Sequence, residues 1–191
     1  MLGNPIKKEV LIALGANQPS QVGPPQQTLA LALERLAEMG LRVLKSSLFY
    51  HTPSFPKGNG PDYVNAAAQL EVALEAQSVL AALHEVEGEF GRERAQRWGQ
   101  RTLDLDLIAI DDEVHPDQAT FYAWRGLPPQ DQAERTPEQL ILPHPRLQDR
   151  AFVLVPLADV APTWRHPVLG QTVAAMRDAL DPADLREVVP I

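Results

Sequence analysis

Two aspartates, Asp104 and Asp106, interrupt an otherwise apolar stretch in the sequence RWGQRTLDLDLIAI, residues 97–110. Alternate residues of a strand project from the same face, so this pattern predicts two carboxylates about 7 Å apart on one face and leucines on the other. Like charges at this spacing repel unless a cation lies between them. Magnesium is the expected cation, because it takes oxygen ligands and is commonly held by one or two carboxylates together with substrate phosphates.

Arginines flank this pair in the sequence, although the chain as a whole is acidic, with a net charge of −8. They form two groups, Arg92, Arg94, Arg97 and Arg101 before the pair and Arg146 and Arg150 after it. Arginine can bind phosphate oxygens through two parallel hydrogen bonds. Local positive charge on an acidic background therefore predicts a small polyanionic ligand and argues against nucleic acid, which needs a broad basic surface.

A simpler interpretation stays open for these residues taken alone. A D-x-D pair often lies on a solvated sheet face, and the arginines of a cluster are often surface residues without a ligand. Their combination favours a phosphate site, because an arginine-rich turn with Trp98 and Gly99 leads directly into the carboxylates. The chain has no G-x-x-x-x-G-K-[ST] loop, so side chains and metal would have to hold a nucleotide.

The composition is that of one globular domain with a good-sized core. Of 191 residues, 45% are hydrophobic and 22% are charged. Cysteine is absent, which excludes disulfides and thiolate metal sites. No apolar run reaches the length of a membrane span, and the short run after Lys7 and Lys8 is better explained as a first strand than as a signal peptide. We therefore expect a cytoplasmic protein.

Strands and helices alternate along the chain. Strands are predicted at 9–15, 41–52, 63–74 and 102–110, with a final strand or tail at 185–191. Leucine spacing predicts helices at 26–40 and 75–91, each ending at a glycine, and further helices are expected at 146–162, broken near Pro156, and at 172–180. Residues 112–139 are rich in proline and predict a long surface loop with room for one helical turn at 121–125. This order favours an α+β domain with an antiparallel or mixed sheet.

The segment RWGQRTLDLDLIAI closely resembles the signature R-W-G-P-R-T-[LI]-D-[LI]-D-[IL] of the 6-hydroxymethyl-7,8-dihydropterin pyrophosphokinase family, with Gln100 in place of the proline. Other segments match the family in the same order: IALGANQ, FYHTPSF, PDYVNAAAQLE, EGEFGRER and LPHPRLQDRAFVLVPLADVAP. The resemblance covers most of residues 9–162. Residues 112–139 are longer than in most relatives, and the tail beyond Pro162 matches only loosely.

The resemblance implies a ferredoxin-like α+β fold, a mainly antiparallel sheet with helices on both faces, in a single pyrophosphokinase domain spanning residues 1–191. It implies transfer of pyrophosphate from ATP to the hydroxymethyl group of 6-hydroxymethyl-7,8-dihydropterin, a step of folate biosynthesis that releases AMP. Two magnesium ions are implied, with ATP as co-substrate. The partners would be these small molecules, without nucleic acid or membrane, and the protein would be a monomer or a weak dimer.

Roles for individual residues are also implied by the resemblance. Both magnesium ions would be held by Asp104 and Asp106, which are catalytic together with Arg92 and Arg101. ATP would be bound by Arg92, Trp98, Arg101, His144 and Arg150. The pterin would be bound by Thr52, Pro53, Phe55, Tyr63, Asn65 and Phe152, with its ring stacked between Tyr63 and Phe152 and its edge hydrogen-bonded to Asn65. Residues 91–100 would close over the substrates.

Two other functions stay in view. A two-metal phosphodiesterase would use the same carboxylate pair, but it predicts further acidic ligands and a general base that the sequence does not display. A non-catalytic ferredoxin-like binding module would need neither the arginine cluster nor the D-x-D pair. Release of AMP from ATP that depends on the pterin distinguishes the three.

Overall fold

The computed structural model describes residues 6–54, 60–91, 101–128, 131 and 135–191. Its strands are β1 (Lys8–Ala16), β2 (Arg42–Ser46), β3 (Tyr50–Thr52), β4 (Tyr63–Val72), β5 (Asp104–Ile110) and β6 (Val189–Pro190). Its helices are α1 (Pro25–Glu38), α2 (Ala76–Glu89), α3 (Gln118–Arg125), α5 (Ala151–Val160), α6 (Val173–Asp178) and α7 (Pro182–Arg186), with a 3₁₀ turn, η1 (Leu147–Asp149).

The strands form one antiparallel sheet in the order β5-β1-β4-β3-β6, and β2 pairs with β4 beside β3. The predicted antiparallel sheet is therefore confirmed. The segment expected as one strand at 41–52 is two strands, β2 and β3, which pair with different parts of β4. Strand β1 lies between β4 and β5 and runs one residue beyond Gly15, where the sequence predicted its end.

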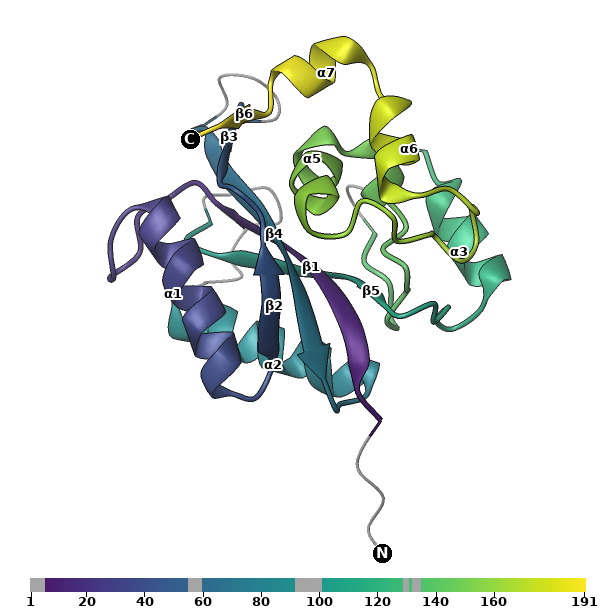
Figure 1. Cartoon of the computed structure of the whole chain (residues 1–191), viewed down its shortest axis with the longest axis horizontal. Coiled ribbons are helices and arrows are strands. Elements are labelled where there is room, and N and C mark those ends of the chain that lie inside the picture. Colours follow the sequence, from purple (N-terminus) through teal and green to yellow (C-terminus); the bar gives the residue numbers. More distant parts are fainter. Residues whose placement is uncertain (1–5, 55–59, 92–100, 129–130, 132–134) are drawn as a thin grey trace, which may run out of the picture.

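The central strand β1 supplies alternate residues to two hydrophobic clusters. Val10, Ile12 and Leu14 pack in the first cluster, to which α1 and α2 contribute, whereas Leu11 and Ala13 pack in the second with α5 and α6. Figure 1 shows α1 and α2 grouped on one side of the molecule and α3, α5 and α6 on the other. Burial of each large aliphatic side chain contributes about 2 kcal/mol, so the two clusters hold the sheet in place from both sides of β1.

Strand β5 follows the predicted alternation up to a bulge. Its leucines, together with Leu103 just before it, are buried in the first cluster, and the two aspartates between them face the other way. Ile12 pairs with Leu107 and Leu11 with Ala109, so Ile108 is an extra residue. Ile108 lies on the same face as the aspartates, and the bulge brings Ala109 to that side as well, so both pack in the second cluster and the polar face of β5 ends at Asp106.

Helix α5 runs without interruption through Pro156, so the predicted break there is wrong. A proline inside a helix removes one backbone hydrogen bond. Here Val153, Leu154 and Leu157 are buried in the second cluster, and Pro156 itself is buried. The packing of this apolar helix outweighs the missing bond.

Residues 112–139, expected as a surface loop, contain the two-turn helix α3. Asp117 caps it by accepting a hydrogen bond from the Thr120 backbone N–H at 2.8 Å. Phe121 is fully buried, and its ring centroid lies 5.1 Å from that of His166 in an edge-to-face arrangement. This part of the segment is therefore packed against the domain by an aromatic anchor.

His166 is fully buried and neutral. Its Nδ1 accepts hydrogen bonds from the backbone N–H groups of Val168 at 3.1 Å and Leu169 at 3.2 Å, so the ring carries its proton on Nε2. Burial, and then the charge of Arg125, lowers the pKa of His166 to about 4. The same side chain in the unfolded chain keeps a pKa of about 6.5.

We expect His166 to make the fold less stable in acid. Between about pH 6.5 and pH 4 the unfolded state binds a proton that the folded state excludes, so its contribution is complete above this range and declines as the pH falls through it. The slope is at most about 1.4 kcal/mol per pH unit. Urea unfolding across this range measures the slope in the wild type and in His166→Asn, whose amide oxygen can still accept a hydrogen bond. An equal slope in both proteins contradicts the assignment.

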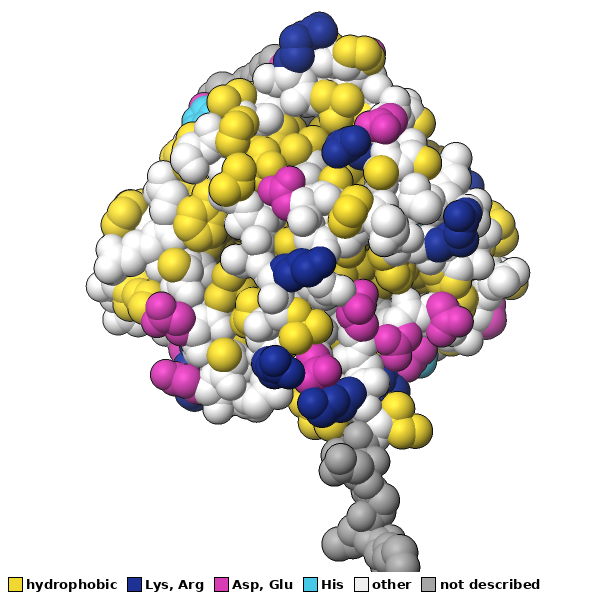
Figure 2. Space-filling model, viewed as in Figure 1, with side chains coloured by type: hydrophobic (Ala, Val, Ile, Leu, Met, Phe, Trp, Pro, Cys, Tyr) yellow, Lys and Arg dark blue, Asp and Glu magenta, His cyan; other side chains and the backbone are white. Residues whose placement is uncertain are grey.

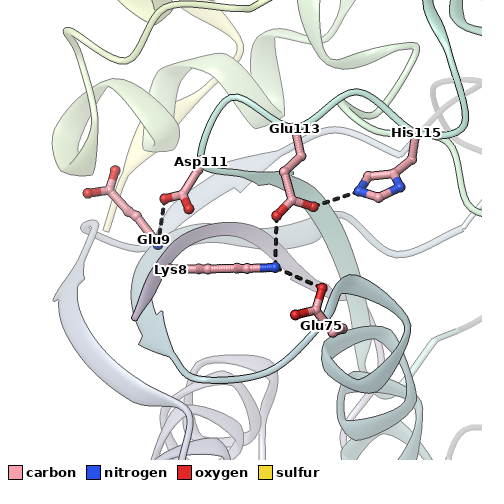
Figure 3. A network of polar contacts seen from close by, with 6 residues as sticks. All are labelled: Lys8, Glu9, Glu75, Asp111, Glu113 and His115. Atoms are coloured by element: carbon pink, nitrogen blue, oxygen red, sulfur yellow. Dashed lines mark hydrogen bonds and ion pairs between the residues drawn. The ribbon is translucent and has the colours of Figure 1, made fainter. Parts of the chain in front are cut away.

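The end of the sheet away from the aspartates is held by a polar network (Figure 3). Lys8 Nζ lies 2.8 Å from Glu75 Oε2 and 2.9 Å from Glu113 Oε1, and His115 Nε2 lies 2.6 Å from Glu113 Oε2. The hydrogen bond to Glu75, and then that to Glu113, raises the pKa of Lys8. The network joins the start of β1 to α2 and to the segment that follows β5.

Charged side chains of both signs also gather on the surface near the start of β1 (Figure 2). Glu71 Oε1 lies 2.8 Å from Lys7 Nζ and 3.1 Å from Arg42 Nη1. Such exposed pairs contribute little to stability. Within the residues that the structure describes, none of the helices combines the length and apolar character needed to cross a bilayer.

Candidate active site

Asp104 and Asp106 point from one face of β5, as the sequence predicted, and both are only partly exposed. Asp104 forms an ion pair with Arg101, which lies three residues earlier in the chain. Burial opposes the charge of Arg101, but the carboxylates of Asp104 and then Asp106 outweigh it, so the pKa of Arg101 is raised. The guanidinium group therefore stays charged beside the carboxylates.

Arg150 comes from a later part of the chain, where it is the N-cap residue of α5. Burial lowers its pKa, while Asp106 and Asp104 act in the opposite direction. An arginine remains charged even so. Two guanidinium groups from segments 49 positions apart thus act on the same two carboxylates.

His144 lies within reach of these charges, on the segment before η1 that pairs with the bulge of β5. Its backbone N–H donates to the carbonyl of Ile108 at 2.8 Å, and its Nδ1 accepts from the backbone N–H of Arg146 at 3.1 Å. Burial, then Arg150 and Arg146, lowers the pKa of His144 to about 3. The ring is therefore neutral at pH 7, and it presents an N–H donor at Nε2.

The residues predicted to bind the pterin gather where β3 pairs with β4. Thr52 is opposite Tyr63, and Asn65 Nδ2 donates to Thr52 Oγ1 at 2.6 Å. Thr52 and Asn65 are buried, and Pro53 is partly buried. Burial raises the pKa of Tyr63, to which Arg101 and Asp104 also contribute with opposite signs. Tyr63 therefore lies close enough to Asp104 for the two side chains to interact electrostatically.

Phe152 lies in the first turn of α5 and is 39% exposed, so its ring is open to solvent. The guanidinium carbon of Arg150 lies 5.7 Å from the centre of this ring, a cation–π contact. The structure thus places the aromatic residue predicted to bind the pterin in contact with an arginine predicted to bind ATP. Phe55, Arg92, Arg97 and Trp98 lie outside the described residues, as does most of the predicted closing loop at 91–100.

Gly15 is a site residue that the sequence singled out only as part of a motif. It pairs with Asp104 on one side and with Asn65 on the other, so it lies between the carboxylates and the amide predicted to bind the pterin. A Cβ at this position would lie 3.0 Å from Asn65 Oδ1 and 4.0 Å from Tyr63 Cδ1. The missing side chain therefore keeps open the space between the two halves of the site.

We expect Gly15→Ala to weaken pterin binding more than folding. The added methyl group would push the Asn65 side chain from its position, and a displacement of this kind can lower the efficiency by roughly tenfold or more. Steady-state kinetics would show a higher KM for the pterin. Gly88→Ala in α2 is the matched control, because an added Cβ there meets nothing within 4 Å. Equal kinetics in the two variants would contradict the role of Gly15.

Two buried polar side chains complete the surroundings of β5. Glu87 of α2 is 1% exposed and accepts a hydrogen bond from the Leu105 backbone N–H at 2.7 Å. Asn17, immediately after β1, accepts one from the Arg101 backbone N–H at 2.8 Å. In the sequence, such positions can be recognised only as polar residues among apolar ones. Their partners become known only from the fold.

The carboxylate pair has the chemistry that magnesium requires. Both ligands are oxygens, they share one face of a strand, and their half-buried position limits competition by water. Among the residues with described positions, no group of three or more His, Asp or Glu side chains could enclose a metal ion. Such a pair leaves coordination positions for substrate phosphates, so the residues present fit magnesium bound together with a nucleotide.

Comparison with known proteins gives an independent indication of the family. Residues 11–162 match the model of the family described as 7,8-dihydro-6-hydroxymethylpterin-pyrophosphokinase (HPPK). A 2-amino-4-hydroxy-6-hydroxymethyldihydropteridine pyrophosphokinase of Synechocystis sp. is 36% identical over 181 residues, covering 94% of this chain and 80% of the relative. The enzyme of that name from Pseudomonas aeruginosa is 37% identical over 163 residues, covering 84% of this chain and 85% of the relative.

A solved structure has the same fold. The Plasmodium falciparum HPPK-DHPS triple mutant with pteroate superposes with a TM-score of 0.62 at 12% identity, covering 93% of this chain. The chain spans only 44% of the length of that protein. The family resemblance found in the sequence is confirmed: the chain belongs to the 7,8-dihydro-6-hydroxymethylpterin-pyrophosphokinase family.

Proposed function

We propose that this chain transfers the pyrophosphoryl group of ATP to the hydroxymethyl group of 6-hydroxymethyl-7,8-dihydropterin, and that the Asp104–Asp106 pair is the centre of the reaction. The products are AMP and the pterin diphosphate, in a step of folate biosynthesis. Family membership supports the reaction. The observation that supports the location is the placement of both carboxylates on one face of β5, within the fields of Arg101 and Arg150.

Asp104 and Asp106 would hold the two magnesium ions. When bound, these ions would neutralise phosphate charge and lower the pKa of the attacking hydroxyl. The protein's own contribution is to keep both carboxylates and their cationic neighbours in place before ATP arrives. The ion pair with Arg101 supports this, because it fixes Asp104 relative to the strand.

Phosphoryl-type transfer depends more on positioning and charge than on covalent chemistry with the protein. Arg101 and Arg150 would contact the triphosphate and stabilise the charge that develops on the transferred group and on the oxygen that leaves with AMP. His144 would donate its Nε2–H to a phosphate oxygen, since its Nδ1 is already an acceptor. Arg92 and Trp98 complete the proposed ATP set from the segment outside the described residues.

The pterin would bind at the other side of Gly15. Asn65 offers an amide to the polar edge of the ring, and Thr52 orients that amide through the 2.6 Å hydrogen bond. Tyr63 and Phe152 would stack on the ring faces, and Pro53 and Phe55 would line the pocket. The hydroxymethyl group would then point toward the carboxylates, a proposal supported by the register, in which Asp104 and Asn65 flank the same glycine.

We also propose that the whole chain, residues 1–191, is a single pyrophosphokinase domain of ferredoxin-like architecture with helices on both faces of the sheet. The two hydrophobic clusters, one with α1 and α2 and the other with α5 and α6, support this description. The family match supports a single domain over residues 11–162.

Formation of AMP from ATP and magnesium tests the reaction when the pterin is varied. We expect AMP and the pterin diphosphate to form together with 6-hydroxymethyl-7,8-dihydropterin, and neither to form with the 6-methyl analogue, which lacks the attacking oxygen. Chromatography of the nucleotides and pterins gives both yields. AMP that forms equally without any pterin would indicate a phosphodiesterase, and no turnover with the complete mixture would overturn the proposal.

A further inference from the structure

We propose that Asn17 is a positioning residue that fixes the Arg101 guanidinium group in the phosphate site. The inference rests on the proposed function, because it assigns Asn17 a part in the same reaction. Asn17 lies immediately after β1, and its side chain is directed away from solvent, with the residue only 7% exposed. It contacts the segment before β5 and the segment before β4.

Asn17 holds the backbone of Arg101 on both sides of that residue. Its side-chain Oδ1 accepts from the Arg101 N–H at 2.8 Å, and its own backbone N–H donates to the Arg101 carbonyl at 3.0 Å. The backbone N–H of Gln18 adds a second donor to the same carbonyl at 3.2 Å. Both polar groups of the Arg101 main chain are thus used, which fixes the direction in which its side chain leaves the backbone.

The same amide reaches the pterin side of the site. Asn17 Nδ2 donates to the carbonyl of Pro61 at 3.3 Å, two residues before Tyr63 at the start of β4. An asparagine side chain offers a donor and an acceptor at once, which neither aspartate nor leucine of similar size can do. One buried amide therefore links the chain leading into the carboxylate strand to the chain leading into the pterin strand.

The position of Arg101 matters because its side chain has many rotatable bonds and ends in a rigid fork. A guanidinium group binds phosphate well only when its N–H groups are aligned with the oxygens. Arg101 already pairs with Asp104, three residues along the chain. Holding its backbone from β1 aligns the fork with both the carboxylates and the incoming phosphates, and a small misplacement of such a group can greatly lower the rate.

Three variants separate this role from general support of the fold. Asn17→Ala removes both side-chain hydrogen bonds. Asn17→Asp keeps the acceptor for the Arg101 N–H and loses the donor to Pro61. Gln18→Ala is the matched control, because the contact of Gln18 with Arg101 is made by its backbone. Thermal unfolding is measured for each, together with kcat, both KM values and the affinity for a non-hydrolysable ATP analogue by calorimetry.

We expect Asn17→Ala to lower kcat by roughly tenfold or more and to weaken binding of the analogue, with a smaller change in the pterin KM. Asn17→Asp should recover most of the loss in kcat, and Gln18→Ala should behave as wild type. If Asn17→Ala does not fold, Asn17→Asp decides: wild-type nucleotide affinity with a raised pterin KM supports the division of roles. Kinetics of Asn17→Ala that match those of Gln18→Ala overturn the proposal, and if that variant does not fold, a pterin KM of Asn17→Asp equal to that of Gln18→Ala overturns it.

A double-mutant cycle with Arg101→Lys tests whether Asn17 acts through Arg101. Lysine keeps the charge but lacks the fork. With lysine at position 101, correct alignment of the backbone therefore contributes less to the rate. We expect Asn17→Ala to have a much smaller effect in the Arg101→Lys background than in the wild type. Equal effects in both backgrounds would show a general structural role. A wild-type protein without pterin-dependent AMP formation would instead refute the proposed function.

Discussion

Replacement of either Asp104 or Asp106 with alanine is expected to lower kcat by about 1,000-fold or more, equivalent to about 4 kcal/mol in the activation barrier. Both side chains project into the site from one face of β5, while the leucines between them hold the strand in the core. On the proposed function, loss of one carboxylate would remove a ligand for the magnesium ions that would neutralise the triphosphate, and no third acidic ligand is grouped with the pair among the described residues.

The fold should survive these substitutions. Neither aspartate is part of the hydrophobic clusters, and alanine fits a strand position with partial exposure. Thermal unfolding and rapid-quench measurement of AMP formation give stability and chemistry separately. Asp104→Asn and Asp106→Asn keep the size of the side chain, and Asp112→Ala removes an exposed carboxylate just after β5 as a control. Near-normal turnover in Asp104→Ala or Asp106→Ala would falsify the assignment of the pair as the catalytic centre.

Much of the fold could be predicted because local pattern and tertiary packing agree. The leucine spacing that predicted helices at 26–40 and 75–91 corresponds to α1 and α2, whose buried faces pack in the first cluster. The alternation at 103–107 predicted the two faces of β5, because a strand with one polar face has only one register that buries its leucines. In these segments a single physical requirement, burial of one face, decides the structure.

Predictions failed where long-range packing decides the structure. Helix α5 continues through Pro156 because its neighbours are buried, which a local rule about proline does not include. Helix α3 is anchored by Phe121 against His166, 45 positions later in the chain, a contact that its short local sequence does not reveal. In both segments the stabilising contact comes from residues far away in sequence.

In the site, too, the sequence predicts which residue types matter, but it does not predict which partners they contact. Asp104 and Asp106 could be found from their spacing, because a strand makes alternate residues neighbours. Gly15 and Asn17 are ordinary turn residues in sequence, and their importance comes from cross-strand register and from two backbone hydrogen bonds to Arg101. Motif resemblance marked their segment, but only the sheet register gives a physical reason for each residue.

Arg101→Ala is expected to lower kcat by about 100- to 1,000-fold, which is the range for removing one group that stabilises developing charge. The side chain is 22% exposed and pairs with Asp104, and its pKa is raised by the carboxylates despite its burial. Its full charge is therefore present at neutral pH. The substitution removes a proposed phosphate ligand and leaves Asp104 without this partner, so we expect both ground-state alignment and charge stabilisation to be lost.

Arg101→Lys separates charge from geometry. Lysine supplies the positive charge but cannot present two parallel N–H groups, so we expect it to recover only part of the loss, with kcat affected more than the KM for ATP. Arg42→Lys at the start of β2 is the matched control, because Arg42 is exposed and pairs with Glu71 at the far end of the sheet. If Arg101→Lys retained wild-type kcat, the fork would be unnecessary and Arg101 would act as a charge alone. Full activity of Arg101→Ala would show that Arg101 has no part in the reaction, because this variant lacks both the charge and the fork of the side chain.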